Sequence, residues 1–462
     1  MRNRVWIPDE AGVRKTKTEY EAMVQRTLTT FLILLGLTVF GLPPINAETL
    51  PNGFKYRIQR RPESQLVAVD VWVRAGASSE RRDEKGCAHF LEHTLFKGTT
   101  HRKSGETDFA IEQLGGIWQA ATGPDYVHLY TTIVPAALDT ALEILDDVLR
   151  NALLPTEEVE KERRVILDEL GKYESELSNR LLAHLYREAL PNHPYQDPPG
   201  GTTDTIQSLR RAQLAAFYKR NYTPERCTIV LVGNVIEANA ANTIEKVFKS
   251  WKAESTQDEP VVPVPERVSA LFVEAEAPLS DGAIAIGWSA PPAKNAKMAV
   301  CGRVVAEIIG SSVAGRLALP ELAGTNANTQ YTPRYQPSLL HISARLPATA
   351  PPSPEQVTQL EMAILRVVTS LTKQPVTTPE LQLAKRQIAI RLRLDSETCL
   401  GLARLIGYAA TVEGDNPEQF KKNLALLNTK DINEYVQQYL RPHQRVVVRY
   451  LPKTVPNVES KP

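Results

Sequence analysis

Two histidines and a glutamate in the stretch HFLEH, residues 89–93, are the clearest candidates for chemistry in this sequence. On a helix, positions i and i+4 lie on the same face, so His89 and His93 can present two imidazole nitrogens to one ion. Glu92 directly precedes His93 and can hold a water on that ion. Zinc suits this set, because catalytic zinc sites use such ligands and leave one position open to water. The alternative is two ordinary helix histidines beside a salt-bridging glutamate.

A catalytic zinc site needs a third protein ligand, and the best candidates lie in ERRVILDEL. Glu162 and Glu169 are seven residues apart (169 − 162), close to two helical turns, so both carboxylates fall on nearly the same stripe of a helix. One can bind the metal while the other hydrogen-bonds a ligating histidine. Either glutamate taken alone would be interpreted as a solvated helix carboxylate. The metal hypothesis fails if Glu169 lies many ångströms from both imidazoles.

The residues around these candidates predict alternating strands and helices. Valines at 67, 69, 71 and 73 indicate a half-buried strand, and helices are expected around 85–98 and 105–114. After a proline-containing linker the same order of elements returns. The stretch that begins at Thr378 echoes the one that begins at Thr156, an offset of 222 residues (378 − 156). The pattern favours an internal duplication over two unrelated halves.

The predicted fold is therefore α+β, with two homologous α/β-sandwich domains, each a mixed sheet with helices packed on one face. The expected limits are 1–47 for an N-terminal extension with a signal peptide or membrane anchor, 48–253 for a zinc-binding catalytic domain, 254–268 for a linker, 269–452 for a homologous domain without metal, and 453–462 for a tail.

Composition excludes some classes of partner. The chain has 462 residues, and its 54 Lys and Arg nearly cancel 53 Asp and Glu. The net charge of +1 is too small to favour binding to nucleic acid or to an anionic membrane surface. The four cysteines, Cys87, Cys227, Cys301 and Cys399, form no CxxC pair, so they are expected to be buried thiols or to form one or two disulfides.

The N-terminal region has the pattern of a secretory signal peptide. Arg26 precedes an apolar run from Leu28 to Leu42, and small residues end at Ala47, ahead of a cleavage site before Glu48. The alternative is an uncleaved anchor formed by residues 28–42, a run that is short for a full span of about 20 residues. Either reading predicts export to the periplasm or cell envelope.

The first half of the chain resembles the pitrilysin and insulinase group of zinc metallopeptidases, especially the mitochondrial processing peptidase type and its bacterial relatives. The resemblance is strong over residues 50–250 and weak over 268–452. The matching stretches are GASSE at 76–80, GCAHFLEHTLFKGT at 86–99, GGIWQAATGPDYVHLY at 115–130, ERRVILDEL at 162–170, HPYQDPPGG at 193–201 and NYTPERCTIVLVGNV at 221–235.

The resemblance implies a role for each residue of the motif. His89, His93 and Glu169 would bind one zinc ion per chain, with Glu162 as the supporting carboxylate. Zinc would lower the pKa of a bound water towards about 7 and polarise the scissile carbonyl. Glu92 would be the general base, which takes the proton of the water and passes it to the leaving amine.

The resemblance also implies where a substrate lies. In the family, the stretch matching GGIWQAAT is an edge strand to which an extended substrate adds, so Gly116, Gln119 and Ala120 are expected to contact it. Gln119 stands where the family usually has asparagine.

Tyr331 fits a substrate-binding tyrosine that the family places in the second half. The family's companion arginine is absent: Gly324 stands in its place, and Arg316 is too far along the chain for a confident match. Glu162 and Glu169 align with Ala384 and Arg391, so the second half has no metal motif.

These expectations together predict a zinc endopeptidase that cuts peptides or unfolded segments inside a chamber. Because the substrate-contact pair is incomplete, a heterodimer with a homologous zinc-less subunit is expected, with a homodimer as the runner-up. A non-proteolytic scaffold or core subunit of the same family is the alternative function. Metal storage or sensing fits less well, since Glu92 and the distal carboxylate form a catalytic arrangement.

Overall fold

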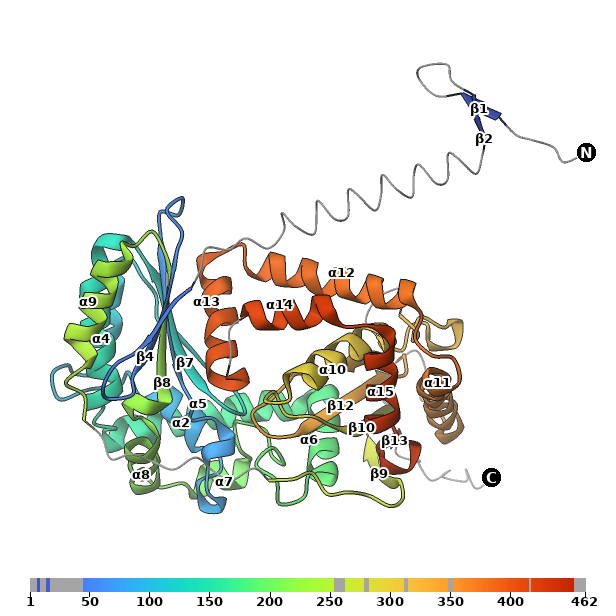
Figure 1. Cartoon of the computed structure of the whole chain (residues 1–462). Coiled ribbons are helices and arrows are strands. Elements are labelled where there is room, and N and C mark those ends of the chain that lie inside the picture. Colours follow the sequence, from blue (N-terminus) through green and yellow to red (C-terminus); the bar gives the residue numbers. More distant parts are fainter. Residues whose placement is uncertain are drawn as a thin grey trace, which may run out of the picture. The chain divides into compact units, whose positions relative to one another are not determined.

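Figure 1 shows a computed structural model of the chain, which describes residues 6–8, 14–16, 45–252, 262–277, 282–310, 315–347, 352–414 and 417–452. A hairpin of β1 (Trp6–Pro8) and β2 (Arg14–Thr16) belongs to one unit, Met1–Ile45, and all other elements belong to a second unit, Asn46–Pro462. The expected signal peptide or anchor at 28–42 and the tail at 453–462 lie outside the described residues, as does part of the expected linker. Among the residues described, no helix has the length and apolarity to cross a membrane.

The first half of the second unit is built on a six-stranded mixed sheet in the order β3-β4-β8-β5-β7-β6. β4 runs parallel to β8, and the other neighbours are antiparallel. β6 therefore forms one edge of this sheet. The strands are β3 (Asn46–Thr49), β4 (Lys55–Arg60), β5 (Val67–Val73), β6 (Gln119–Thr122), β7 (Val127–Ile133) and β8 (Cys227–Gly233).

The helices of this half bury their apolar stripes against the sheet. In α4 the buried positions follow helical spacing, as the period of about 3.6 residues requires for a helix with one face in the core. The helices are α2 (Cys87–Thr94), α3 (Glu106–Gln113), α4 (Leu138–Asn151), α5 (Thr156–Ser175), α6 (Leu177–Ala189), α7 (Thr203–Ser208), α8 (Arg211–Asn221) and α9 (Glu237–Phe248).

The second half repeats this plan. Its sheet has the order β11-β12-β10-β13-β9, with β9 parallel to β13 and the other neighbours antiparallel. The strands are β9 (Leu271–Ala277), β10 (Ala283–Ala290), β11 (Asn328–Gln330), β12 (Ser338–Arg345) and β13 (Val446–Pro452). The helices are α10 (Ala296–Ile309), α11 (Pro354–Lys373), α12 (Thr378–Asp395), α13 (Cys399–Tyr408), α14 (Pro417–Leu426) and α15 (Thr429–Tyr439).

Five strands of the first sheet match the five strands of the second sheet. The order β4-β8-β5-β7-β6 of the first sheet corresponds to β9-β13-β10-β12-β11 of the second, and β3 is an additional edge strand of the first. In both sets of five, the first strand along the chain pairs in parallel with the last one, and a short strand forms the far edge. The predicted α+β fold of two homologous units with mixed sheets is confirmed.

One helix from each half packs against the sheet of the other half, an exchange that the sequence pattern did not predict. α13 packs against β5 and β8 on the face opposite α4 and α9, and α6 packs against β10 and β13 (Figure 1). The valine alternation predicts a half-buried β5, yet all residues from Val67 to Val73 are buried because α13 covers the second face. The helices of one half thus cover one face, and the exchanged helix covers the other. The domain limits expected from the sequence stay a prediction, since α6 and α13 pack across them.

A glycine allows the closest contact between α13 and the first sheet. A Cβ added at Gly407 would lie 2.0 Å from Nε1 of Trp72. The Trp72 side chain is buried, stacks on His128 with ring centroids 4.4 Å apart, and meets the ring of Tyr408 edge-on. The indole is therefore held on several sides, and no side chain larger than hydrogen fits at position 407.

A buried polar cluster fixes the turn between β6 and β7 to the second half. Asp125 in this turn accepts hydrogen bonds from the Tyr195 hydroxyl at 2.5 Å, the Ser78 hydroxyl at 3.1 Å and the Tyr335 backbone amide at 3.0 Å. Burial raises the pKa of Asp125, while these hydrogen bonds and the nearby Arg334 charge oppose that shift. The Arg334 guanidinium lies over the rings of Tyr186 and Tyr195. The β6–β7 hairpin is thus hydrogen-bonded to residues from three separate parts of the chain.

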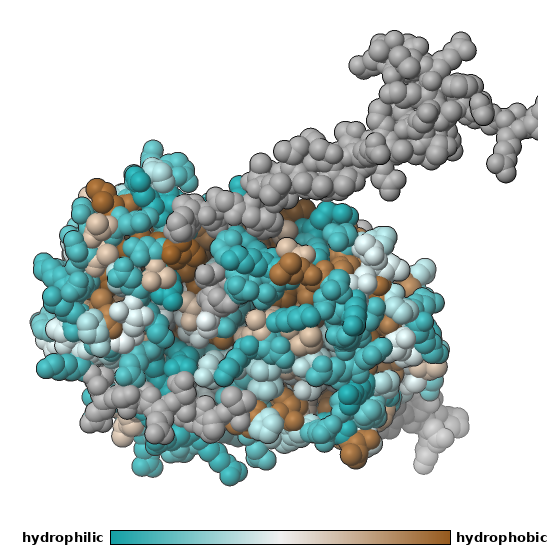
Figure 2. All heavy atoms as spheres, viewed as in Figure 1, coloured by the Kyte–Doolittle hydropathy of each residue, from teal (hydrophilic) through white to brown (hydrophobic). Residues whose placement is uncertain are grey.

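The surface drawn in Figure 2 is mainly hydrophilic, with hydrophobic residues scattered over it. This mixture is usual for a soluble globular surface. Exposed large apolar side chains include Phe109 on α3 and Ile117, two residues before β6, of which Ile117 is 70% exposed.

The close approach of α13 to Trp72 predicts that Gly407→Ala lowers the free energy of unfolding by about 1–3 kcal/mol, the usual range for overpacking. Helix propensity alone would favour alanine by about 1 kcal/mol. Gly171→Ala is the matched control: Gly171 lies within α5 with nothing within 4 Å of an added Cβ, so the change should stabilise the protein by about 0.5–1 kcal/mol. Urea unfolding of both variants measures the two effects, and a stabilised Gly407→Ala would contradict the packing described here.

Candidate metal centre

Helix α2 presents its polar residues on one side because its other side is in the core. Cys87, Ala88, Phe90, Leu91 and Thr94 are buried, whereas His89, Glu92 and His93 are only partly buried. The helix begins after Gly86, whose φ of +94° favours glycine. At the same end, the Ala88 amide donates a hydrogen bond of 2.8 Å to the Glu80 carboxylate. The apolar pattern of the stretch HFLEH thus decides which way the two histidines face.

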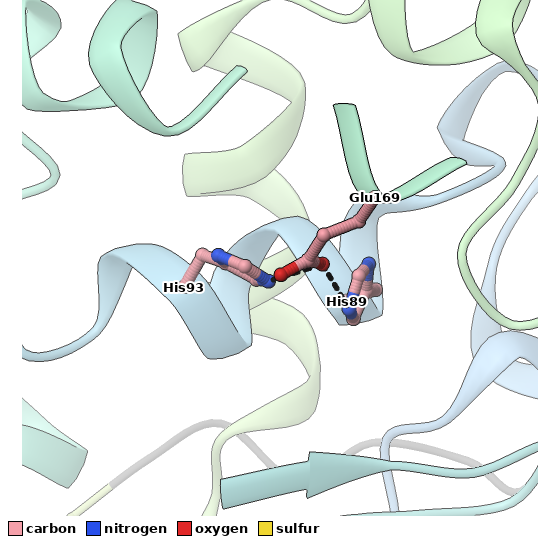
Figure 3. A group of neighbouring side chains, drawn as sticks. All are labelled: His89, His93 and Glu169. Carbon is pink, nitrogen blue, oxygen red and sulfur yellow. Dashed lines mark ion pairs between the residues drawn. The ribbon is translucent and has the colours of Figure 1, made fainter. Parts of the chain in front are cut away.

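Helix α5 brings Glu169 to both histidines. Oε2 of Glu169 lies 3.4 Å from Nε2 of His93 and 3.9 Å from Nε2 of His89. Figure 3 shows the carboxylate between the two imidazole rings, which project from one helix. One donor atom from each residue lies within 4.8 Å of the others. The structure therefore assembles the three predicted ligands, while their role as ligands stays a prediction.

The geometry and electrostatics of this group fit a divalent metal such as zinc. Two donors that each lie about 2.0–2.1 Å from a tetrahedral zinc are roughly 3.4 Å apart, close to the Glu169–His93 separation. Burial lowers the pKa of His89, and the neighbouring His93 lowers it further, against the opposing charges of Glu92 and Glu169. The neutral imidazole that a metal requires is thus favoured. No other group of three such ligands occurs among the described residues.

Glu162 orients the second histidine. Nδ1 of His93 lies 3.1 Å from Oε2 of Glu162, where it donates a hydrogen bond. Lys97 forms an ion pair with the other oxygen of Glu162, with 3.0 Å between Nζ and Oε1. A carboxylate on Nδ1 fixes the tautomer that leaves Nε2 free for a metal. Lys97 was not singled out in the sequence, although it follows His93 by four residues (97 − 93) in the same motif.

Glu92 is held by a residue that the sequence did not indicate. The hydroxyl of Thr122, the last residue of β6, donates a short hydrogen bond to Oε2 of Glu92. Thr122 lies in the GGIWQAAT stretch, but nothing in the sequence pairs it with a residue 30 positions earlier. The sequence offers one indication that Thr122 belongs to the site: it lies two residues after Ala120, on the same face of the expected strand.

Two of the three predicted substrate contacts in the first half lie on an open strand edge. Gln119 and Ala120 pair with Tyr130 and Leu129 of β7 on one side. Within the described residues, no strand pairs with the other side of β6. Gly116 instead has a packing role: a Cβ there would lie 2.8 Å from Oγ1 of Thr131 and 2.9 Å from Cγ2 of Ile133.

The structure does not bring Tyr331 to this group. The Tyr331 side chain lies in the core of the second half, against Gly302, and its hydroxyl donates a 2.7 Å hydrogen bond to the Pro291 carbonyl. Arg316 is engaged elsewhere, in an ion pair of 2.8 Å with Glu380. The arginine–tyrosine pair expected in the family is therefore not assembled by these residues, and a substrate-binding role for Tyr331 stays a prediction.

The corresponding helices of the second half meet through different chemistry. Arg391 on α12, which aligns with Glu169, forms an ion pair with Glu307 on α10. Ala384, which aligns with Glu162, is buried in the core. The contact between α10 and α12 thus contains an ion pair, whereas the corresponding contact between α2 and α5 contains imidazoles and carboxylates.

All four cysteines are free thiols. Cys87, Cys227 and Cys301 are buried, and Cys399 is partly exposed. Burial raises the pKa of the Cys87 thiol. Cys87, the first residue of α2, is therefore a neutral core residue on the buried side of that helix.

Two family models match the chain in succession. Residues 56–203 match the model described as insulinase (peptidase family M16), and residues 208–388 match the model described as peptidase M16 inactive domain. The first match contains the metal group together with Thr122.

Individual relatives agree with these matches. A mitochondrial-processing peptidase subunit beta of Blastocladiella emersonii is 31% identical over 210 residues, which are 46% of this chain but only 45% of that relative. An uncharacterized zinc protease of Rickettsia felis is 25% identical over 394 residues, 84% of this chain and 93% of the relative. The chain thus matches less than half of the length of some curated relatives and nearly all of others.

A solved structure shares the fold over most of the chain. The structure described as a protease from Helicobacter pylori superposes with a TM-score of 0.81 at 22% identity, covering 89% of this chain and all of that one. A coverage of 89% means that the likeness extends over both halves. With both family models matched in order and the metal group inside the first, the chain belongs to peptidase family M16, the insulinase family.

Proposed function

We propose that this protein is a zinc-dependent endopeptidase that hydrolyses peptides or unfolded segments. The observation that carries the proposal is the meeting of His89, His93 and Glu169 beside a carboxylate, Glu92, that a hydrogen bond holds in place. Membership of a peptidase family and relatives named as zinc proteases support it.

In the proposed site, Nε2 of both histidines and the Glu169 carboxylate hold one zinc ion per chain. When bound, zinc would supply a Lewis acid that polarises the scissile carbonyl and makes an attacking water more acidic. Glu162 keeps the His93 ring oriented through Nδ1, and Lys97 balances the charge of Glu162.

Glu92 is the proposed general base. Its carboxylate takes a proton from the attacking water and returns it to the amine that leaves when the peptide bond breaks. Its place one residue before His93 on α2 puts it beside the metal group while leaving the three ligands to the ion.

The proposed substrate is an extended segment that adds to the open edge of β6. Strand addition uses main-chain hydrogen bonds, so it requires an unfolded or flexible peptide and tolerates many side chains. Gln119 and Ala120 are the proposed backbone contacts, and Gln119 is exposed enough to offer its amide as well.

A second subunit is proposed to complete the site. Tyr331 is buried, Arg316 is paired with Glu380, and Gly324 stands where the family has arginine. A homologous zinc-less subunit that supplies the missing pair and closes a chamber is therefore favoured over a homodimer. Relatives named as beta subunits support this choice. From the N-terminal pattern we also propose an exported protein of the periplasm or cell envelope.

Replacement of the base should separate metal binding from catalysis. Glu92→Gln is expected to keep one zinc per chain and to lose cleavage by about 10²- to 10⁴-fold, the usual contribution of a general base. A quenched fluorescent peptide, assayed with and without chelator, measures cleavage, and metal analysis measures zinc. Normal cleavage by the variant would refute the base assignment. A wild-type protein that binds zinc but cuts no peptide, even with its partner, would favour the scaffold alternative.

Loss of the supporting carboxylate should weaken metal binding. Glu162→Gln removes the charge behind His93, so we expect zinc affinity to fall by about 10- to 100-fold. Glu157→Gln is the matched control on the same helix, because Glu157 is 81% exposed and pairs with the exposed Lys161. Competition against a chromogenic chelator at fixed pH compares the two. Equal affinities would show that Glu162 does not support the site.

The partner proposal predicts low peptidase activity for the protein expressed alone. Co-expression with a homologous zinc-less protein encoded nearby should give a larger species on size-exclusion chromatography and much faster peptide cleavage. A homodimer alone with full activity would support the runner-up, whereas a fully active monomer would rule out the need for a second subunit.

A further inference from the structure

The strand proposed to bind substrate also contacts the proposed base. Thr122 is the last residue of β6, and its backbone pairs with Val127 across the hairpin. Its side chain points to α2, where the hydroxyl donates to Oε2 of Glu92. Among the described residues, this hydrogen bond directly links β6, the strand proposed to bind substrate, with α2, the helix that carries both histidines.

The link matters because Glu92 needs one orientation to accept a proton. A glutamate side chain has three rotatable bonds, and a partly exposed one samples several rotamers. A hydrogen bond to an ionised carboxylate is stronger than one between neutral groups. The Thr122 hydroxyl occupies one oxygen of Glu92 and so leaves the other oxygen for the proton of the water.

The hairpin that carries Thr122 is itself fixed. Asp125, three residues later in the turn (125 − 122), is held by Ser78, Tyr195 and the Tyr335 amide. Gly76 packs so closely that an added Cβ would lie 2.4 Å from the Gly123 carbonyl oxygen. The position of the Thr122 hydroxyl is thus set by contacts that do not involve Glu92.

We propose that Thr122 is a positioning residue that orients Glu92 for proton transfer and ties that orientation to the strand along which substrate lies. The inference rests on the proposed function. The Thr122 hydroxyl proton is directed at Glu92, so its main effect falls on turnover and not on substrate affinity. A structural role in the sheet would instead depend on the shape of the side chain, which valine preserves.

Three variants test this proposal in the zinc-loaded protein with its partner. Thr122→Val keeps the β-branched shape and removes the hydroxyl, so kcat should fall by about 10- to 100-fold, the worth of one hydrogen bond to a charged group. KM should change less than about threefold, and zinc content should stay the same. Thr122→Ser keeps the hydroxyl and should restore most of kcat. Thr131→Val is the matched control on β7, because the buried Thr131 hydroxyl has no hydrogen-bond partner among the described residues.

Crystal structures of the two Thr122 variants give a readout that needs no activity. Glu92 should turn away from its present position in Thr122→Val and keep it in Thr122→Ser. An unmoved Glu92 in the valine variant overturns the proposal. So does an undiminished kcat in that variant, a rise in KM alone, or a serine variant as slow as the valine one. If the wild-type protein cuts no peptide, the proposed function fails, and the two structures still decide whether Thr122 orients Glu92.

Discussion

The packing of α2 against α5 is the contact on which the candidate site depends. It places two imidazoles and two carboxylates within a few ångströms, an arrangement in which burial makes the charged form of His89 unfavourable. The apolar sides of the same helices offset this cost. Phe90 and Leu91 of α2 and Ile166 of α5 are fully buried, and each such side chain contributes about 1.5–3 kcal/mol on burial. Core packing therefore holds together polar groups that would otherwise separate, and an ion bound between them would favour the same geometry.

The exchange of α6 and α13 makes the two halves depend on each other. Without α13, the Trp72 face of β5 would be open to water, and without α6 the Leu339 and Val448 face of the second sheet would be open as well. The Asp125 cluster adds a hydrogen bond from the Tyr335 amide across the same boundary. Helix α2, which carries both histidines, therefore lies in a half whose sheet is covered on one face by α13 from the other half. We expect the two halves to unfold together.

The duplication shows how one scaffold supports two kinds of contact. α2 with α5 and α10 with α12 are corresponding helix pairs, yet one carries the candidate metal ligands and the other an Arg391–Glu307 ion pair. The apolar residues that pack each pair are retained in both halves, which is why the fold is shared while the chemistry differs. The proposed function thus depends on a few polar positions of one helix pair, α2 with α5.

Features that depend on local spacing could be predicted from the residues alone. HFLEH places two histidines on one helix face, Glu162 and Glu169 share a stripe, and the repeated order of elements predicts the duplicated fold, because helical and strand periods act over a few residues. Contacts between groups far apart in the chain depend instead on how the elements pack. The burial of both faces of β5 depends on Gly407, which is 335 residues after Trp72 (407 − 72), and the orientation of Glu92 depends on Thr122 in another element. Tyr331 likewise matched a motif but lies buried, since exposure is set by packing between elements that no local pattern encodes.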